Sequence, residues 1–475
     1  MNLDFLKKIK KTEFKTADDY LTIPFMDTVN DESFYSTTQV MKILVGVTGQ
    51  GKTFSTARFF IPHLIENHGV KFVIVSAPQK GILEKNDFAV GASKCNAQLT
   101  DDIETALMFA ENDVPVVLLK CHAAIMHDDK GQKLQKFLLE NSIKFAVFVD
   151  EAHTWLCSDK ENYKNVVGWT GNKHEARYFK MLAKLSKVSP FMFGLTATPN
   201  AEQLGKIGTI GDMSFEVINT FAPKPLLINQ TAYFGKTLFY TPNHLIGATE
   251  TAFEEFVKNV YDETESCGFK KTAIVACSVD NAANGFNKDV VKKLLTNILI
   301  KNPYTSKDTK SIAIMTGKKD ETGSYDLDGS FQKLTDDEIK TKLNDGNDPL
   351  MFLVVVNKGQ MGMNVYTLKN YFTFKYTDKM DKSGDALEEF PIQGVGRLIR
   401  LNTGFSKVKD FTTKYGYNLG NYMKTLNKEE KKNLLVANTM NVVVPNNAMW
   451  GAAIDTFQKV YASSIVQAKT HFKVS

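Results

Sequence analysis

Short apolar runs that alternate with helical periods are the feature that most limits how this chain can fold. In the first half these runs occupy 42–47, 71–77, 114–119, 144–149 and 191–195, and they are rich in β-branched and aromatic residues. Because they are apolar at nearly every position, both faces of each predicted strand must be covered. Strands of this kind belong to parallel sheets, whose crossovers require helices. The periodic segments 52–67, 131–141 and 174–187 supply them.

The same alternation returns in the second half of the chain. Strands are predicted at 271–277, 311–315 and 351–356, and helices near 249–265 and 287–301. The charged stretch 317–348 is predicted to form an exposed loop and a helix. Between the two halves, residues 214–245 lose the rhythm and contain Pro223 and Pro225, which favour an extended connector.

A chain of 475 residues is too long for one compact domain. We expect an α/β protein with two tandem doubly wound parallel-sheet domains, a short N-terminal extension and a mainly helical C-terminal tail. The predicted boundaries are an extension at 1–35, a first domain at 36–222, a linker at 223–245, a second domain at 246–405 and a basic helical segment at 406–475.

Composition indicates an ordinary globular protein, with 43% apolar and 23% charged residues. No run is long enough to cross a bilayer, and the first residues lack the apolar stretch of a signal peptide. The five cysteines stand far apart without CxxC spacing, which argues for a reducing interior and against a disulfide framework or a zinc site. We therefore expect a cytoplasmic protein, in the host cytoplasm if it is phage-encoded, with no membrane partner.

The basic residues are unevenly distributed. Residues 405–475 carry ten Lys against four acidic residues, which suits binding of a phosphate backbone, although a solvated lysine-rich face explains the charge more simply. Only four of the 58 basic residues are Arg: Arg58, Arg177, Arg397 and Arg400. In a chain that nearly always uses Lys, a retained Arg indicates a place that needs a planar, always-charged group.

A phosphate-binding pattern follows the first predicted strand. Residues Gly46, Val47, Thr48, Gly49, Gln50, Gly51, Lys52 and Thr53 fit GxxxxGK followed by Ser or Thr, and a predicted helix begins at the end of the pattern. The glycines let backbone N–H groups surround phosphate oxygens, and the helix N-terminus adds the positive end of its dipole. Lys52 would reach the β- and γ-phosphates of ATP, and Thr53 would bind Mg²⁺.

An acidic pair closes the strand predicted at 144–149. Asp150 and Glu151 would lie at the carboxyl edge of the sheet, where open α/β sheets bind their ligands. Asp150 would then hold Mg²⁺, and Glu151 would orient and deprotonate an attacking water. Solvated capping explains such a pair equally well by itself, but the upstream phosphate loop favours the catalytic role.

Two further motifs complete the set. Thr196 and Thr198 flank Ala197 at the end of the strand at 191–195, a signal that a polar turn before Pro199 explains equally well. Gln393, Arg397 and Arg400 would share one face of a helix and form a clamp for a γ-phosphate. A surface helix paired with acidic neighbours is the alternative, and the scarcity of Arg elsewhere argues against it.

Together these motifs resemble those of superfamily 2 DEAH-type helicases and translocases, in the same order and spacing over about residues 40–402. The resemblance implies two RecA-like domains. It further implies that Gln393 orders the γ-phosphate and water, and that Arg397 and Arg400 reach the nucleotide from the second domain. His153, Thr196 and Thr198 would couple ATP hydrolysis to closure of the two domains.

Weaker matches to the same family imply contacts with nucleic acid. Their residues are Pro78 and Lys80 after the second strand, Ser278, Thr316 and Gly317 after strands of the second domain, and Gly362 and Asn364 further on. The motif style is closest to restriction-motor-like and phage DNA helicases. The sequence departs from the family pattern where Cys121-His122 replaces a Thr-Pro pair and where Asn364 replaces an Asp.

The resulting hypothesis is an ATP- and Mg²⁺-dependent helicase or translocase, a nucleic-acid-stimulated ATP hydrolase that works as a monomer. DNA is favoured over RNA as its track, and the sequence leaves that choice open. The alternatives are the motor subunit of a restriction-type nuclease and an ATP-switched clamp that does not unwind. Protein partners would belong to a replication, recombination or restriction complex. No nuclease pattern of the PD…(D/E)xK kind is found, so cutting would need such a partner.

Overall fold

The computed structural model describes about three fifths of the chain, from Asp31 to Ile454. The described residues are 31–45, 52–77, 83, 85–127, 129–152, 181–196, 213–219, 233–240, 246–266, 270–277, 285–301, 311–316, 318–356, 365–375, 394–396, 398, 425–446, 450–451 and 454. The described residues divide between Ala222 and Pro223 into two compact units, and each is described by itself.

The first unit is built on a parallel sheet. Within the described residues its strands are β1 (Val40–Val45), β2 (Phe72–Ala77), β3 (Gln98–Thr100), β4 (Val116–Cys121), β5 (Phe145–Asp150), β6 (Met192–Thr196) and β7 (Ser214–Asn219). They pair in the order β3-β4-β2-β5-β6-β1-β7, all parallel. Every residue of β2 and β5 is buried, as the continuous apolar runs predicted.

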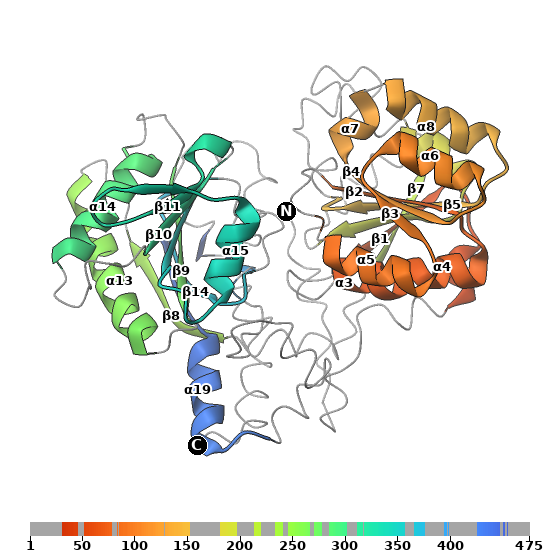
Figure 1. Ribbon diagram of the computed structural model, residues 1–475. Coiled ribbons are helices and arrows are strands. Elements are labelled where there is room, and N and C mark those ends of the chain that lie inside the picture. Colours follow the sequence, from red (N-terminus) through yellow and green to blue (C-terminus); the bar gives the residue numbers. More distant parts are fainter. Residues whose placement is uncertain are drawn as a thin grey trace. The chain divides into compact units, whose positions relative to one another are not determined.

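Helices cover both faces of this sheet (Figure 1). On one side lie α3 (Lys52–Ser55), α4 (Ile61–His68) and α5 (Lys85–Lys94), and on the other α6 (Ile103–Glu111), α7 (His122–His127) and α8 (Asp129–Glu140). A π-helical stretch, η3 (Thr56–Phe60), joins α3 to α4. The short 3₁₀ turn η2 (Glu32–Tyr35) precedes β1.

Aromatic rings fix η2 and the helix after β1 onto the sheet. The rings of Phe148 and Phe193 stack at 4.8 Å on neighbouring strands, and Phe34 stacks on Phe193 at 5.6 Å. Phe60 from η3 meets Phe148 edge-on at 5.7 Å. Aromatic pairs of this geometry stabilise beyond the area they bury, so the start of this unit is well anchored.

The second unit contains a mixed sheet. Its described strands are β8 (Tyr233–Tyr240), β9 (Lys271–Val275), β10 (Ile312–Met315), β11 (Gly323–Tyr325), β12 (Phe331–Lys333), β13 (Phe352–Val355), β14 (Leu368–Thr373) and β15 (Thr439–Pro445). The order is β12-β11-β10-β13-β9-β14-β15-β8. Only the β10–β11 and β11–β12 pairs are antiparallel. The α/β class expected for the chain is therefore confirmed.

Helices α13 (Ile246–Ser266) and α14 (Lys288–Lys301) cover one face of this second sheet, and α15 (Asp336–Asn344) lies on the other (Figure 1). Aromatic side chains of α13, among them Phe253 and Phe256, pack on Phe372 of β14. The short turn η7 (Lys319–Glu321) and α19 (Lys428–Asn438) complete the described elements. A capping box at Thr335 and Glu338 starts α15. None of the described helices is long and apolar enough to cross a membrane.

Strands occur in several segments where the sequence-based expectation placed none. The predicted linker 223–245 contains β8, the predicted helical tail contains β15, and the predicted loop at 317–348 contains the hairpin β11–β12. As an edge strand, β8 leaves Leu238 and Phe239 partly exposed, so it lacks the continuous burial that marked the other strands. The strands of the hairpin are antiparallel, and β12 is exposed along its length, so it lacks the continuous apolar run of a buried parallel strand.

Candidate nucleotide site

Three neighbouring strands of the first unit end at the same edge of the sheet. Asp150, the last residue of β5, is paired with Leu195 of β6, and Thr196 at the end of β6 is paired with Val45 at the end of β1. Helix α3 then begins with Lys52. The strand order β5-β6-β1 thus brings the acidic pair, Thr196 and the start of α3 to the carboxyl edge, where α/β sheets bind ligands.

A direct contact joins the two residues predicted to bind Mg²⁺. The Oγ1 of Thr53 donates a hydrogen bond of 2.9 Å to the Oδ2 of Asp150. The other oxygen, Oδ1, accepts a 3.0 Å hydrogen bond from the backbone N–H of Glu151. Both oxygens of the carboxylate are therefore held in place, and Asp150 is only 4% exposed.

Burial raises the pKa of Asp150 well above its ordinary value, and the neighbouring charge of Glu151 raises it further. The hydrogen bond from Thr53 and the positive charge of Lys52 act in the opposite direction. Two carboxylates that lie close together away from water repel each other, and a nearby positive charge would relieve that repulsion. A divalent cation at this edge would supply that charge and lower the pKa of the Asp150 carboxyl.

The oxygens present here suit Mg²⁺. Mg²⁺ prefers hard oxygen ligands at about 2.0–2.1 Å in octahedral geometry, so two adjacent ligand oxygens lie about 2.9 Å apart. The Thr53 hydroxyl and the Asp150 carboxylate oxygen have that separation. A magnesium ion bound at these oxygens would also contact nucleotide phosphates and neutralise their charge.

The backbone of Glu151 is strained. Its φ angle is 51°, in the left-handed region that residues with a Cβ seldom adopt, and its side chain is only 8% exposed. Strained, buried residues of this kind concentrate at functional sites. The turn is held because the N–H of Ala152 donates a 2.9 Å hydrogen bond to the carbonyl of Leu195.

The same turn explains why a glycine, Gly194, stands two residues before Thr196 in β6. A Cβ on Gly194 would lie 3.1 Å from the Cβ of Ala152 and 2.6 Å from the Cδ1 of Ile43. The chain after Asp150 therefore passes over β6 at a position where a side chain would collide. Thr196 itself is completely buried, consistent with a position between the ends of β1 and β5 rather than on the surface.

The remaining predicted site residues fall into two groups. Those outside the described residues are Gly46, Val47, Thr48, Gly49, Gln50, Gly51, Pro78, Lys80, His153, Thr198, Ser278, Gly317, Gly362, Asn364, Gln393, Arg397 and Arg400. Lys52, Thr53, Asp150, Glu151, Thr196 and Thr316 are described, and all but Thr316 belong to the edge of the first sheet.

Thr316 has a structural engagement that the sequence did not indicate. It is fully buried, and its Oγ1 donates a 3.1 Å hydrogen bond to the carbonyl of Lys318. Its backbone N–H donates to the Oγ1 of Thr322 at 3.3 Å. In this geometry Thr316 closes the loop between β10 and β11.

Arg58, one of the few arginines of the chain, makes contacts that the rarity of Arg alone did not predict. Its Nε and Nη2 both contact the Oδ1 of Asp87, at 2.9 and 2.7 Å, and its guanidinium lies 5.0 Å from the centre of the Phe54 ring. A planar group that serves both contacts is the kind of position for which Lys is a poor substitute. The pair ties α5, which follows Pro78 and Lys80 in the chain, to the helix that follows the phosphate loop.

Cys121 and His122, which stand where the helicase family has a Thr-Pro pair, place an uncharged ring near the carboxyl edge of the first sheet. His122 follows β4, and burial lowers its pKa to about 3, against a weaker effect of a backbone hydrogen bond with Ser76. The imidazole is therefore neutral at physiological pH. It adds no positive charge where β2 and β4 end side by side.

Comparison with known proteins agrees with these motifs. Residues 9–201 match the family described as "Type III restriction enzyme, res subunit". That match covers the phosphate loop, the acidic pair and Thr196. None of the curated proteins compared with the chain matches it.

Among solved structures, the chain is similar to the DUF1998 helicase MrfA bound to DNA, with 12% identity, a TM-score of 0.49, and coverage of 96% of this chain and 53% of that one. It is also similar to the ATP-dependent Type ISP restriction-modification enzyme LlaBIII bound to DNA, with 12% identity, a TM-score of 0.47, and coverage of 97% and 33%. It is similar as well to the helicase Lhr of Mycobacterium smegmatis bound to ssDNA and AMP-PNP, with 12% identity, a TM-score of 0.45, and coverage of 89% of this chain and 46% of that one. The chain thus spans about half or less of the length of these proteins.

Proposed function

We propose that this protein is an ATP-dependent helicase or translocase that acts on nucleic acid, with DNA favoured over RNA. The observation that carries the proposal is the hydrogen bond between Thr53 and Asp150, with Glu151 directly beside it. It brings the end of the phosphate-loop motif to the acidic pair, as a Mg²⁺–ATP site requires. The family match at residues 9–201 supports the same class.

In this proposal the first unit binds the nucleotide. Lys52 contacts the β- and γ-phosphates, Thr53 and Asp150 hold the cation, and Glu151 accepts a proton from the attacking water. Glu151 is suited to this because it is nearly buried and its backbone is fixed, so little rearrangement accompanies the reaction. His153, Thr196 and Thr198 would couple ATP hydrolysis to a conformational change in the rest of the chain.

The second unit would supply the groups that stabilise the transferring phosphate. Gln393, Arg397 and Arg400 carry this part of the proposal, because their motif matches that of the superfamily and because Arg is so rare in the chain. Guanidinium groups that reach the γ-phosphate in the transition state raise turnover by roughly 10³–10⁵ in related chemistry. Hydrolysis would then depend on the two units closing on one nucleotide.

A second candidate is the motor subunit of a restriction-type complex, and the description of the matching family favours it specifically. In that case a separate subunit would cut or modify DNA, and the chain would copurify with it. An ATP-switched clamp is the third candidate. It would show stimulated ATPase without strand displacement. For all three we propose a cytoplasmic site of action.

One experiment tests the central claim. ATPase rates are measured for the wild-type chain and for Arg400→Lys against single-stranded, double-stranded and forked DNA and RNA. We expect stimulation by nucleic acid in the wild type, greatest with DNA. Arg400→Lys should abolish the stimulated rate while ATP and nucleic-acid binding stay nearly intact. Unchanged turnover in that variant would contradict the assignment, and greater stimulation by RNA would contradict the preference for DNA.

A further inference from the structure

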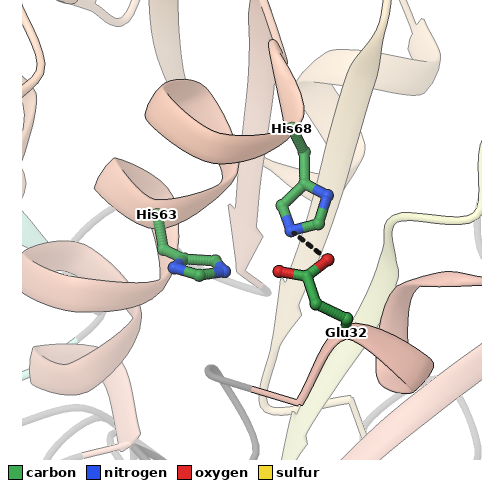
Figure 2. Close-up of side chains that lie close together, drawn as sticks. All are labelled: Glu32, His63 and His68. Atoms are coloured by element: carbon green, nitrogen blue, oxygen red, sulfur yellow. Dashed lines mark ion pairs between the residues drawn. The ribbon is translucent and has the colours of Figure 1, made fainter.

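Three side chains that can bind a metal meet on the first unit, on elements that the nucleotide site does not use. Glu32 comes from η2, and His63 and His68 come from α4 (Figure 2). One ligand atom of each lies within 4.8 Å of the other two. The Nε2 of His68 is 3.7 Å from the Oε2 of Glu32, and the two imidazole centres are 5.3 Å apart. Figure 2 shows both rings and the carboxylate facing one another.

The backbone fixes both ends of this cluster. The side chain of Asp31 accepts a 3.0 Å hydrogen bond from the N–H of Ser33 and so caps η2, which carries Glu32. At the other end, Gly69 adopts φ 66° and stops α4 immediately after His68. The N–H of Val70 then donates to the carbonyl of Leu64 at 3.1 Å, which closes the helix end.

The two rings are also held by their neighbours. The Tyr35 ring lies 4.3 Å from that of His68 and stacks at 5.7 Å on that of His63. Phe191 lies 5.5 Å from His68 on another side. Because these partners are core residues, the imidazoles cannot swing away from one another. Glu32, by contrast, has a side chain that is 73% exposed and can adjust its position.

Both imidazoles present a nitrogen atom that the folded chain leaves unsatisfied. Within the described residues, the Nε2 atoms of His63 and His68 are buried and make no hydrogen bond. Buried polar atoms without a partner are costly and call for an explanation, such as an ion. Burial, and then the proximity of His68, lowers the pKa of His63.

The other nitrogen of His63 has the support that metal-binding histidines require. Its Nδ1 lies 2.8 Å from the Nδ2 of Asn67, one helical turn further on. Amide nitrogen and oxygen are assigned from their surroundings, and turning the Asn67 amide over would place its oxygen against the ring and make Nδ1–H the donor. That arrangement leaves the lone pair on Nε2, directed at His68 and Glu32, as in metal sites whose histidines are oriented by a second partner.

We propose that Glu32, His63 and His68 bind a zinc ion. Two imidazole nitrogens and one carboxylate oxygen are a zinc ligand set, whereas Mg²⁺ and Ca²⁺ prefer all-oxygen sites. In tetrahedral coordination neighbouring ligand atoms lie about 3.3 Å apart, so no two of the three ligand atoms, which lie within 4.8 Å of one another, need to close by more than about 1.5 Å. A fourth position stays open for water.

The bound ion would join η2, near the start of the first unit, to the end of α4. Zinc binding should therefore stabilise the folded first unit, and the zinc proposal does not depend on the proposed ATPase activity. The expectation of no zinc site came from the spacing of the cysteines, and this site contains none.

The test uses the full chain, stripped of metal and then titrated with Zn²⁺ or Co²⁺ alone. We expect one tight equivalent of Zn²⁺ by calorimetry, a Co²⁺ visible spectrum of the intense tetrahedral type, and a higher melting temperature with Zn²⁺. Glu32→Gln removes an exposed ligand without disturbing the core, and His68→Gln removes a nitrogen ligand. Each should raise the Kd at least about tenfold and abolish both the spectrum and the thermal shift.

Glu66→Gln is the matched control, because Glu66 is exposed on the same helix and lies outside the three-residue cluster. It removes the same charge and should bind Zn²⁺ as the wild type does. Excess Mg²⁺ should not displace the ion. The proposal is overturned if the wild type takes up no tight equivalent, or if Glu32→Gln and His68→Gln bind like the wild type. It is also overturned if Glu66→Gln loses the ion equally.

Discussion

The hydroxyl of Thr53 donates a 2.9 Å hydrogen bond to the carboxylate of Asp150, joining the start of α3 to the end of β5 across 97 positions of the sequence. The parallel sheet makes this contact, because β1 and β5 both end at the edge from which α3 begins. The contact orients both predicted magnesium ligands before any cation binds. Preorganised ligands of this kind lose little entropy when the ion arrives.

Replacing Thr53 tests that relationship. Thr53→Val keeps the shape but removes the donor, so the buried Oδ2 of Asp150 loses its partner, at a cost of roughly 1–3 kcal/mol. Thr53→Ser keeps the hydroxyl and should cost less. Urea unfolding measures the free energy of unfolding of both variants. Titration with Mg²⁺ in the presence of ATP should show weaker binding of the cation in the Val variant only. Equal stability of the two variants would contradict the importance of this hydrogen bond.

Asp150→Asn should reveal the raised pKa of the native carboxyl. A carboxyl whose folded pKa lies above its unfolded value binds its proton more tightly in the folded state. Its contribution to stability is therefore present at low pH and is lost as the pH rises through the folded pKa. Asn cannot ionise, so relative to the wild type the metal-free variant should gain stability on going from about pH 4 to pH 8, by on the order of 1–3 kcal/mol.

Urea unfolding of both proteins at several pH values, without metal, measures this difference. Mg²⁺ at neutral pH should then stabilise the wild type and leave Asp150→Asn unchanged, because the cation favours the ionised carboxylate. A stability difference that does not vary with pH would show that Asp150 has an ordinary pKa.

The strained backbone of Glu151 predicts an inverted preference between Gly and Ala. At ordinary positions Ala is the more stabilising of the two, but at φ 51° a Cβ is penalised by roughly 1–2 kcal/mol. Glu151→Gly should therefore be more stable than Glu151→Ala by about 1 kcal/mol in thermal or urea unfolding. Both should lose ATP hydrolysis, since neither has a carboxylate. If Ala is the more stable, the left-handed conformation is wrong.

The parallel sheets and the acidic edge could be predicted because they leave local signals. Continuous burial produces apolar runs, and a phosphate loop and a carboxylate at strand ends have fixed spacing. Other strands were missed because polar side chains interrupt them. In β14, Lys369 is buried and donates to the carbonyl of Leu398, and Asn370 accepts a 3.0 Å hydrogen bond from Asn441 of β15.

The cluster of Glu32, His63 and His68 left no signal of the usual kind. Its histidines are five positions apart, and its glutamate lies on a separate element that only the aromatic packing of η2 brings close. The left-handed backbone at Glu151 was likewise invisible, because the residue type gives no hint of it. Such features depend on tertiary contacts, which local periodicity does not encode.

The approach of α5 to η3 supplies the last prediction. A Cβ on Gly91 would lie 1.7 Å from the carbonyl oxygen of Ala57, so Gly91→Ala must push α5 away from η3. The Arg58–Asp87 pair crosses the same contact and would be stretched by that shift. We expect a loss of roughly 1–3 kcal/mol in the free energy of unfolding, typical of forced overpacking. Gly451→Ala is the control, because nothing lies within 4 Å of a Cβ there. Urea unfolding monitored by amide exchange should place the loss in the first unit, in α5 and η3. Equal stability of the two variants would mean that the helices do not approach this closely.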